Sequence, residues 1–276
     1  MNYDLHSHSN TSDGALSPTA LVERAYQHGV THLALTDHDT TKGLATAKVC
    51  AKQLGMTFIN GIELSALWEN KSIHIVGLGI NPDYPELANA MQHIQDLRLE
   101  RAAKMAAKLE KRNIKGALEA VQEAAGQGTI TRSHFADFLL TQGHVDTHQQ
   151  AFDRYLSRGK PAYVPSVGID LPIAIQWINE SGGIAVLAHP LRYQLTHSWL
   201  NRLLKDFKNA GGQAMEVVTG RTNTNEIKLL ATLAQRYQLA GSRGSDFHSP
   251  AHVYPELGRL FPIPDNIQPV WSLLPV

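Results

Sequence analysis

Histidine and carboxylate side chains gather directly after several short apolar runs of the chain. The set holds six imidazoles and three carboxylates: His6, His8, Asp13, His38, Glu63, His74, His189, Asp246 and His248. Mixed nitrogen and oxygen ligands suit zinc, manganese or iron and disfavour the metals that prefer thiolates. Nine ligands exceed what one ion takes, so the set predicts two or three divalent ions, with Glu63 as a bridge. Ions about 3.5–4 Å apart can bind the attacking and the leaving oxygen of an in-line displacement.

Each part of this set also has an ordinary structural explanation. A single histidine after a strand is more often a hydrogen-bonded structural residue than a ligand, and Asp37 or Asp39 could cap the following helix. The joint placement favours metal binding, because the clusters fall at the same end of separate strands, where chance would have scattered them. Apart from His134, the remaining histidines, His252 among them, lack this placement and are expected in surface or structural roles.

Short apolar runs alternate with amphipathic segments and must position these side chains. Strands are predicted at residues 3–5, 32–36, 57–63, 74–80, 184–188, 214–218 and 239–242, and helices at 18–28, 43–54, 172–181 and 225–237. The alternation indicates parallel strands with helical crossovers, although it does not separate a barrel from an open sheet. In such folds ligands bind where the carboxyl ends of the strands meet, and the candidate ligands fall there.

The alternation breaks between residues 85 and 165. A long charged helix is predicted at 87–112, a turn at Gly126-Gln127-Gly128, and shorter helices around 133–142 and 147–157. We interpret residues 85–165 as an all-helical insert and residues 1–84 and 166–276 as the α/β domain that carries it. The alternative is that the segment extends the same domain.

Composition limits the classes of protein to consider. Lys+Arg and Asp+Glu both number 25 in the 276 residues, so no basic excess indicates a protein that coats long nucleic acid. The single Cys50 excludes an internal disulfide and cysteine-rich zinc sites. The chain shows no charged leader and no run near the roughly 18 apolar residues of a membrane span. A cytoplasmic enzyme is expected, with no membrane contact and no stable protein partner.

Taken together, the motifs resemble those of the PHP (polymerase and histidinol phosphatase) superfamily. The resemblance rests on Leu5-His6-Ser7-His8, Thr36-Asp37-His38-Asp39, Gly61-Ile62-Glu63, His74-Ile75-Val76-Gly77, Ala188-His189-Pro190 and Ser245-Asp246-Phe247-His248. It covers the chain apart from the insert, and it implies a distorted seven-stranded (β/α) barrel with a trinuclear metal site.

Carried over to this chain, the resemblance implies three groups of ligands. One ion would be held by His6, His8, Glu63 and Asp246, a second by Glu63, His74 and His189, and a third by Asp13, His38 and His248. Mn²⁺ is the expected metal, with Fe²⁺ or Zn²⁺ as alternatives. Glu63 would act as the bridging carboxylate, and Asp13 or His248 would assist proton transfer to the leaving oxygen.

The insert resembles a bacterial subgroup of the superfamily, the RNase AM and 3′,5′-nucleotide bisphosphate phosphatase subgroup. This resemblance rests on Thr131-Arg132-Ser133-His134-Phe135-Ala136 and Gly159-Lys160-Pro161-Ala162-Tyr163-Val164-Pro165. It implies that the insert caps the substrate. Arginine forks match phosphate geometry, although a surface arginine is more often simply solvated. The candidate substrate-binding residues are Arg132, Lys160, Arg192, Arg221 and His134.

The expected function is hydrolysis of terminal phosphoesters of nucleotides by a 3′,5′-nucleotide bisphosphate phosphatase and 5′-3′ exoribonuclease. Its substrate would be a small nucleotide, a short RNA or the 5′ end of an RNA. A histidinol-phosphate phosphatase is one alternative. A non-catalytic PHP domain with a binding or scaffold role is another, and a metal-dependent amidohydrolase with a similar barrel is a third.

Overall fold

The computed structural model describes residues 1–126, 128–251 and 255–274. Gln127, in the predicted turn, and His252 lie outside these ranges. The strands are β1 (Tyr3–Asp4), β2 (His32–Leu35), β3 (Thr57–Trp68), β4 (Lys71–Leu78), β5 (Ile169–Asp170), β6 (Ile184–Leu187), β7 (Ala214–Thr219) and β8 (Ala240–Gly244). The helices are α1 (Pro18–Gln27), α2 (Leu44–Gln53), α3 (Pro85–Glu110), α4 (Ala117–Ala125), α5 (Arg132–Thr141), α6 (His148–Ala151), α7 (Leu171–Glu180), α8 (His197–Asn209) and α9 (Thr224–Arg236).

Seven strands form one sheet that is nearly closed into a barrel. Their order is β1-β2-β3-β4-β6-β7-β8, and the short β5 pairs with β3. The first and last strands meet, because the backbone N–H of Leu5 donates to the carbonyl of Arg243 at 3.1 Å and that of His8 to Phe247 at 2.9 Å. The distorted seven-stranded barrel expected from the sequence is therefore confirmed.

Strand β4 corrects the prediction that all the strands run parallel. It pairs antiparallel with both β3 and β6. The physical reason is the connection: Glu69 and Asn70, with φ of 49° and 58°, turn β3 directly into β4 as a hairpin, which leaves no room for a crossover helix. Because β4 runs backwards, His74 near its start still lies at the rim where the parallel strands end.

The outer helices begin and end where local sequence signals place them. Ser17 caps α1 by accepting a hydrogen bond from the backbone N–H of Ala20, and Pro18 occupies the first turn. Asn223 and Glu226 form a reciprocal capping box at the start of α9. The sequence predictions include no helix at the position of α8. Thr196 is nevertheless a typical N-cap residue there, because its side chain accepts a hydrogen bond from the backbone N–H of Trp199. None of the helices in the described ranges combines the length and apolar character needed to cross a membrane.

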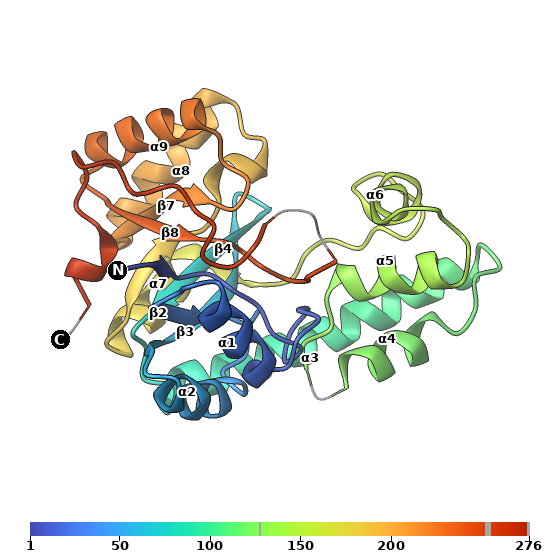
Figure 1. Cartoon of the computed structure of the whole chain (residues 1–276). Helices are drawn as coiled ribbons and strands as arrows, with labels where there is room; N and C mark the ends of the chain where they lie inside the picture. Colours follow the sequence, from blue (N-terminus) through green and yellow to red (C-terminus); the bar gives the residue numbers. More distant parts are fainter. Residues whose placement is uncertain (127, 252–254, 275–276) are drawn as a thin grey trace.

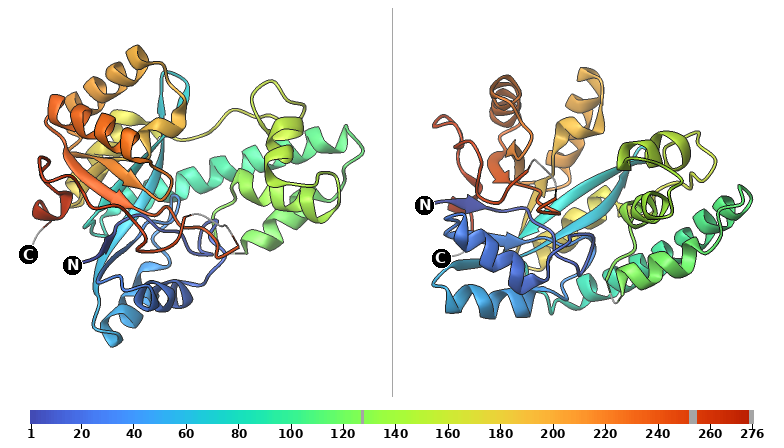
Figure 2. Two further views of the ribbon diagram at one scale, coloured as in Figure 1. Left: turned by 45° about the horizontal axis from the view of Figure 1, so that its top comes forward. Right: turned by 45° about the vertical axis from the view of Figure 1, so that its right-hand side comes forward.

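The barrel with its outer helices and the helices α3 to α6 lie side by side (Figure 1), and each part has a hydrophobic core. The larger core packs the outer helices on the barrel, and the strands are buried on both faces: Leu33 and Leu35 belong to this core, whereas Ala34 packs with the side chains of a separate cluster. The second core consists of residues between Ala102 and Ala162. Helix α3 contributes to both, with Leu87 and Ile94 in the first and Met105 and Leu109 in the second. Figure 2 shows helices α3 to α6 projecting from one side of the barrel.

Candidate metal centre and substrate pocket

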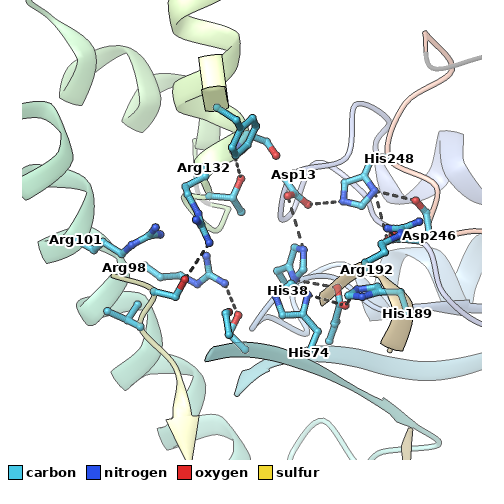
Figure 3. A pocket seen from close by; sticks show the side chains of 18 residues that line it. Asp13, His38, His74, Arg98, Arg101, Arg132, His189, Arg192, Asp246 and His248 are labelled. Carbon is cyan, nitrogen blue, oxygen red and sulfur yellow. Dashed lines mark hydrogen bonds and ion pairs between the residues drawn. The ribbon is translucent and has the colours of Figure 1, made fainter. Parts of the chain in front are cut away.

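The nine candidate ligands converge at one rim of the barrel from six different segments. His6 and His8 follow β1, Asp13 lies in the next loop, and His38 follows β2. Glu63 lies within β3 and His74 within β4, while His189 follows β6 and Asp246 and His248 follow β8. In Figure 3 the labelled side chains of this set point toward one another on one side of a pocket.

Glu63 lies at the centre of the cluster. Its Oε2 lies 3.3 Å from His6 Nε2, 3.3 Å from His8 Nε2 and 3.0 Å from His38 Nδ1. Its Oε1 lies 3.0 Å from His74 Nδ1 and 3.1 Å from His189 Nε2. One carboxylate thus contacts five of the six imidazoles, which is the arrangement that a bridging ligand needs.

Three groups of side chains offer ligand atoms that lie within 4.8 Å of one another. The groups are His6, His8, Glu63 and Asp246; His8, Asp13, His38 and His248; and His38, Glu63 and His74. The first group has the four members expected from the family resemblance. The second contains the expected trio together with His8. In the third, His38 stands where His189 was expected, although His189 also contacts Glu63.

The chemistry of this donor set fits metal ions. His8 Nδ1, His38 Nδ1, His189 Nδ1 and Glu63 Oε2 are buried and make no hydrogen bond. Buried polar atoms in folded proteins nearly always have hydrogen bonds, so the missing hydrogen bonds of Glu63 Oε2 and of His38 Nδ1, 3.0 Å from it, fit a site that would hold cations. The described residues therefore include clusters that are able to hold metal ions.

The ionisation of the clustered side chains also supports metal binding. Burial would raise the pKa of Glu63, but the imidazoles of His38, His6 and His74 outweigh it and hold this pKa well below its usual range. Burial would lower the pKa of His8, but Asp246 and Glu63 raise it to about 10. The ionised carboxylates thus stabilise positive charge in a buried site, and divalent cations can supply that charge.

Backbone strain accompanies the site motifs. Asp39, His189 and Asp246 have positive φ angles of 51°, 28° and 55°, which residues other than glycine rarely adopt. Such strain is concentrated at functional sites, where the surrounding structure holds it in place.

Several supporting side chains escaped the sequence analysis. The buried carboxylate of Glu216, on β7, accepts hydrogen bonds from His6 Nδ1 at 2.7 Å and from the backbone N–H of His189 at 2.6 Å. The signal was available, because an acidic residue within an apolar strand needs a buried partner. Tyr193 also lies behind the site: its hydroxyl accepts from the backbone N–H of His74 and donates to the carbonyl of Ala188, both at 2.9 Å.

Asp37 and Asp39 do not cap helix α2, whose N-cap is Gly43. Asp37 accepts hydrogen bonds from the hydroxyls of Ser9, Thr11 and Ser12 at 2.5–2.7 Å and so fixes the loop that carries Asp13. Asp39 accepts from Arg98 of α3.

A pocket of ≈ 400 Å³ opens in front of the cluster. Figure 3 shows Arg98, Arg101 and Arg132 on one side of this pocket and Asp13, His38, His74, His189, Arg192, Asp246 and His248 on the other. A pocket of this volume is in the range that holds small ligands.

The structure brings some of the candidate substrate-binding residues together and leaves others apart. Arg132 and Arg192 line the pocket, and Arg192 also forms an ion pair with Asp246. Arg221 lines a neighbouring pocket of ≈ 210 Å³, which shares His189 and Arg192 with the first. Lys160 is exposed and is not among the lining residues. His134 does not line the pocket either, and its Nδ1 accepts a hydrogen bond from the backbone N–H of Thr131 at the start of α5.

Arg98 and Arg101 were missed because helix α3 was predicted only as a charged helix with an apolar stripe. Both are buried, and they lie at helical spacing between Ile94 and Met105, on the same face. Arginines within an apolar stripe are the signal that could have found them.

Comparison with known proteins agrees with this geometry. Residues 4–163 match the PHP domain family. The 5′-3′ exoribonuclease Rnm of Escherichia coli K12 is 45% identical over 273 residues, which cover 98% of this chain and 93% of that protein. A 3′,5′-nucleoside bisphosphate phosphatase of Chromobacterium violaceum is 42% identical over 274 residues, which cover 99% of this chain and 96% of that protein.

A solved structure has the same fold over nearly the whole chain. It is described as an amidohydrolase from Chromobacterium violaceum with bound sulfate and no metal. Its TM-score is 0.94 at 42% identity, and the match covers 99% of this chain and 95% of that chain. A family match over more than half of the residues, together with full-length relatives above 40% identity, leads to one conclusion. The chain belongs to the PHP domain family.

Proposed function

We propose that this protein is a metal-dependent phosphoesterase that hydrolyses terminal phosphoesters of nucleotides. It acts as a 3′,5′-nucleotide bisphosphate phosphatase and as a 5′-3′ exoribonuclease on short RNA or RNA 5′ ends. The observation that carries the proposal is the pocket, in which a carboxylate–imidazole cluster around Glu63 faces a wall of arginines. Relatives at 42–45% identity bear the names of both activities, which supports the same substrates here.

In this proposal, His6, His8, Asp13, His38, Glu63, His74, His189, Asp246 and His248 hold two or three divalent ions, with Mn²⁺ as the first choice and Fe²⁺ or Zn²⁺ as alternatives. When bound, such ions supply Lewis-acid polarisation of a phosphoryl group. Glu63 would hold ions through both of its carboxylate oxygens, which is supported by its contacts with His38 and His74.

Asp13 and His248 are the groups that we propose for proton transfer to the leaving oxygen. His248 Nδ1 lies 3.0 Å from the carbonyl oxygen of Asp246, which can only accept, so this nitrogen carries the proton. His248 Nε2 faces Asp13 Oδ1 at 3.3 Å, and both side chains line the pocket. Whichever of these two side chains would not be holding an ion is positioned to transfer a proton beside the substrate.

Residues 85–165 form the cap of the active site in this proposal. The support is that α3 and α5 contribute Arg98, Arg101 and Arg132 to the pocket wall that faces the cluster. Arg192, from the barrel side, is proposed to contact the reacting phosphate. We further propose a cytoplasmic location, for which cell fractionation is the test.

The test combines metal analysis with a phosphate-release screen. The protein loaded with Mn²⁺ is expected to hydrolyse adenosine 3′,5′-bisphosphate and short 5′-phosphorylated RNA faster than histidinol phosphate. H8A and D246A are expected to lose bound metal and activity together, because each removes a side chain that lies against Glu63 or His8. A matched control is E23Q, which changes an exposed residue of α1.

Three outcomes would contradict the proposal. Full activity in excess chelator would remove the metal mechanism. Faster hydrolysis of histidinol phosphate would favour that phosphatase activity instead. No hydrolysis of any phosphoester by the metal-loaded protein would favour a binding or scaffold role.

A further inference from the structure

The neighbouring pocket of ≈ 210 Å³ lies directly beside the candidate active site. Two residues, His189 and Arg192, line both pockets. The rest of its lining comes from the turn Pro190–Tyr193 after β6, from the end of β7 and the loop that follows it, and from α9. Because β6 and β7 are parallel neighbours, these loops lie at the rim that also carries the candidate ligands.

The lining of the neighbouring pocket combines apolar surface with one cation and one anion. The apolar part comes from Pro190, Leu191 and Leu230. Arg221 is exposed, and it forms no hydrogen bond or ion pair with any residue that the structure describes. Glu226 accepts from the backbone N–H of Asn223 through Oε2 at 2.8 Å, which leaves Oε1 available. An apolar lining with a few polar groups of opposite charge suits an uncharged ligand that has both donors and acceptors.

The loop after β7 is held in place by its own contacts. Thr222 Oγ1 accepts from the backbone N–H of Thr219 and donates to its carbonyl, both at 2.9 Å. Gly220 lies so close to the loop after β8 that a β-carbon there would be 2.6 Å from the carbonyl oxygen of Ser245. The neighbouring pocket is therefore preformed, and a ligand would not have to order this loop in order to bind.

The two activities proposed above differ in what the reacting phosphate carries. A nuclease that starts at the 5′ end of an RNA cuts at the phosphate after the first nucleotide, and the same phosphate is the 3′-phosphate of a 3′,5′-bisphosphate. In both reactions a water oxygen bonds to phosphorus, the bond from phosphorus to the 3′ oxygen breaks, and that oxygen takes up a proton. In RNA the phosphate also carries the next nucleoside, which the bisphosphate lacks. One site for both reactions therefore needs a further space beside the reacting phosphate.

We propose that the neighbouring pocket binds the second nucleoside of an RNA substrate, the one that is esterified to the reacting phosphate. The reacting phosphate lies at the carboxylate–imidazole cluster, and the chain passes from there into the neighbouring pocket along His189 and Arg192, which line both. This inference rests on the proposed function and assigns the neighbouring pocket to the nuclease reaction alone.

The contacts that hold the nucleoside follow from the lining. The base packs against the apolar side chains of Leu191 and Leu230. Arg221 donates to an acceptor of the nucleoside, and Glu226 accepts from one of its hydroxyl or amino groups. A volume of ≈ 210 Å³ is below the roughly 300–1,000 Å³ of pockets for drug-sized ligands, so one nucleoside uses most of it.

The test compares a substrate that has the second nucleoside with one that lacks it. The Mn²⁺-loaded enzyme is assayed on the 5′-phosphorylated dinucleotide of adenosine and on adenosine 3′,5′-bisphosphate. In R221Q and in E226Q, kcat/KM for the dinucleotide is expected to fall about 10-fold, mainly through KM, because each variant weakens a hydrogen bond to the nucleoside. The bisphosphate is expected to change less than about 2-fold.

The two variants change the local charge in opposite directions, so a parallel loss in both cannot come from a general change in the field at the active site. The amide of E226Q can still accept from Asn223 and so keeps the cap of α9, which thermal unfolding checks. The matched control is K228Q, which removes an exposed cation of α9 that does not line the pocket. It is expected to leave both substrates unaffected.

Three outcomes would overturn the inference: equal losses on the two substrates in R221Q, an unchanged dinucleotide reaction in R221Q, or opposite effects of R221Q and E226Q on the dinucleotide. All three leave hydrolysis of the bisphosphate measurable in the wild type. A wild-type enzyme that hydrolyses neither substrate is a failure of the proposed function, and it is a different result.

Direct binding gives a readout that does not depend on turnover. Dinucleotide and bisphosphate are each titrated calorimetrically into the full chain in the presence of chelator, with wild type, R221Q and K228Q compared. Binding of the dinucleotide that is weaker by about 10-fold in R221Q alone, with unchanged binding of the bisphosphate, supports the inference. Equal weakening for both ligands, or no weakening for either, overturns it.

Discussion

Glu216 lies behind the imidazole of His6 and determines how that ring faces the cluster. It holds His6 Nδ1 at 2.7 Å, and Nε2 is left pointing at Glu63 Oε2, 3.3 Å away. The other oxygen of Glu216 accepts from the backbone N–H of His189 at 2.6 Å. One buried carboxylate therefore orients two segments that carry candidate ligands, as carboxylates behind metal-bound histidines commonly do.

Replacing Glu216 by glutamine is expected to weaken metal binding by about 10- to 100-fold while the protein stays folded. The amide keeps the size of the side chain but removes the negative charge that supports His6. Calorimetric titration with Mn²⁺ measures the effect, and E23Q on the exposed face of α1 serves as the control. Metal affinity equal to that of wild type in E216Q would show that Glu216 has only a packing role.

The candidate ligands could be found from sequence because all but Asp13 directly follow or lie within an apolar run, and parallel folds gather strand ends at one rim. The same rule does not identify functional residues that lie away from the strand ends. The motif resemblance predicts substrate contacts for Lys160 and His134, but the structure places neither in the pocket lining. Arg101 and Glu216 stand out as charged residues within apolar patterns, but the elements they face lie far apart in sequence, so the local pattern does not show which site they join.

At the scale of elements, the long helix α3 connects the metal-site motifs to the insert. Arg98 of α3 holds Asp39, which directly follows His38, and Gln95 Nε2 donates to the carbonyl of Asp39 at 3.1 Å. Thr129 adds a further link, because its hydroxyl donates to the carbonyl of His38 at 2.9 Å. The loop after β2 is thus held by the insert as well as by the barrel.

Replacing Arg98 by methionine should destabilise the protein by about 3–5 kcal/mol, because it leaves the carboxylate of Asp39 buried without its partner. Urea unfolding monitored by circular dichroism gives this value, and R112M, at an exposed arginine just after α3, is the matched control. In the double variant R98M/D39N much of the loss is expected to be recovered, since no unpaired charge remains. A full additive loss in the double variant would argue against the ion pair as the cause.

Helices and strands were predictable where the hydrophobic periodicity was clear, but the direction of each strand in the sheet was not. The runs that became β2, β6 and β7 have the predicted type and nearly the predicted bounds. The reversal of β4 depends on a two-residue turn, Glu69-Asn70, whose sequence is not the usual Asn-Gly or Asp-Gly of such hairpins. Strand β3 continues to Trp68, so Glu63 lies inside this strand and does not end it as the sequence predicts.

For the whole molecule, the helical residues between Ala102 and Ala162 pack in a hydrophobic core of their own. Phe135, Leu139 and Leu109 belong to this core, while the helices outside the barrel pack around residues such as Phe207. The candidate ligands all lie in segments outside residues 85–165. The boundaries 85 and 165 remain a prediction, and the consequence of the division can be measured.

Truncation of Phe135 to alanine should cost about 3–5 kcal/mol in the core of the insert. Limited proteolysis is expected to show faster cleavage within residues 85–165, and hydrolysis of the bisphosphate should drop while bound metal stays near the wild-type amount. The matched control F207A disrupts the barrel core and should lose metal as well. Loss of metal in F135A to the same degree would show that the two cores do not act separately.

Helix α3 has one further consequence. It is a continuous helix of 26 residues, about 39 Å long, whose first turns are embedded in one core and whose last turns are embedded in the other. Such a strut lacks a hinge, so the arginine wall stands at a fixed distance from the opposite wall instead of swinging shut like a lid.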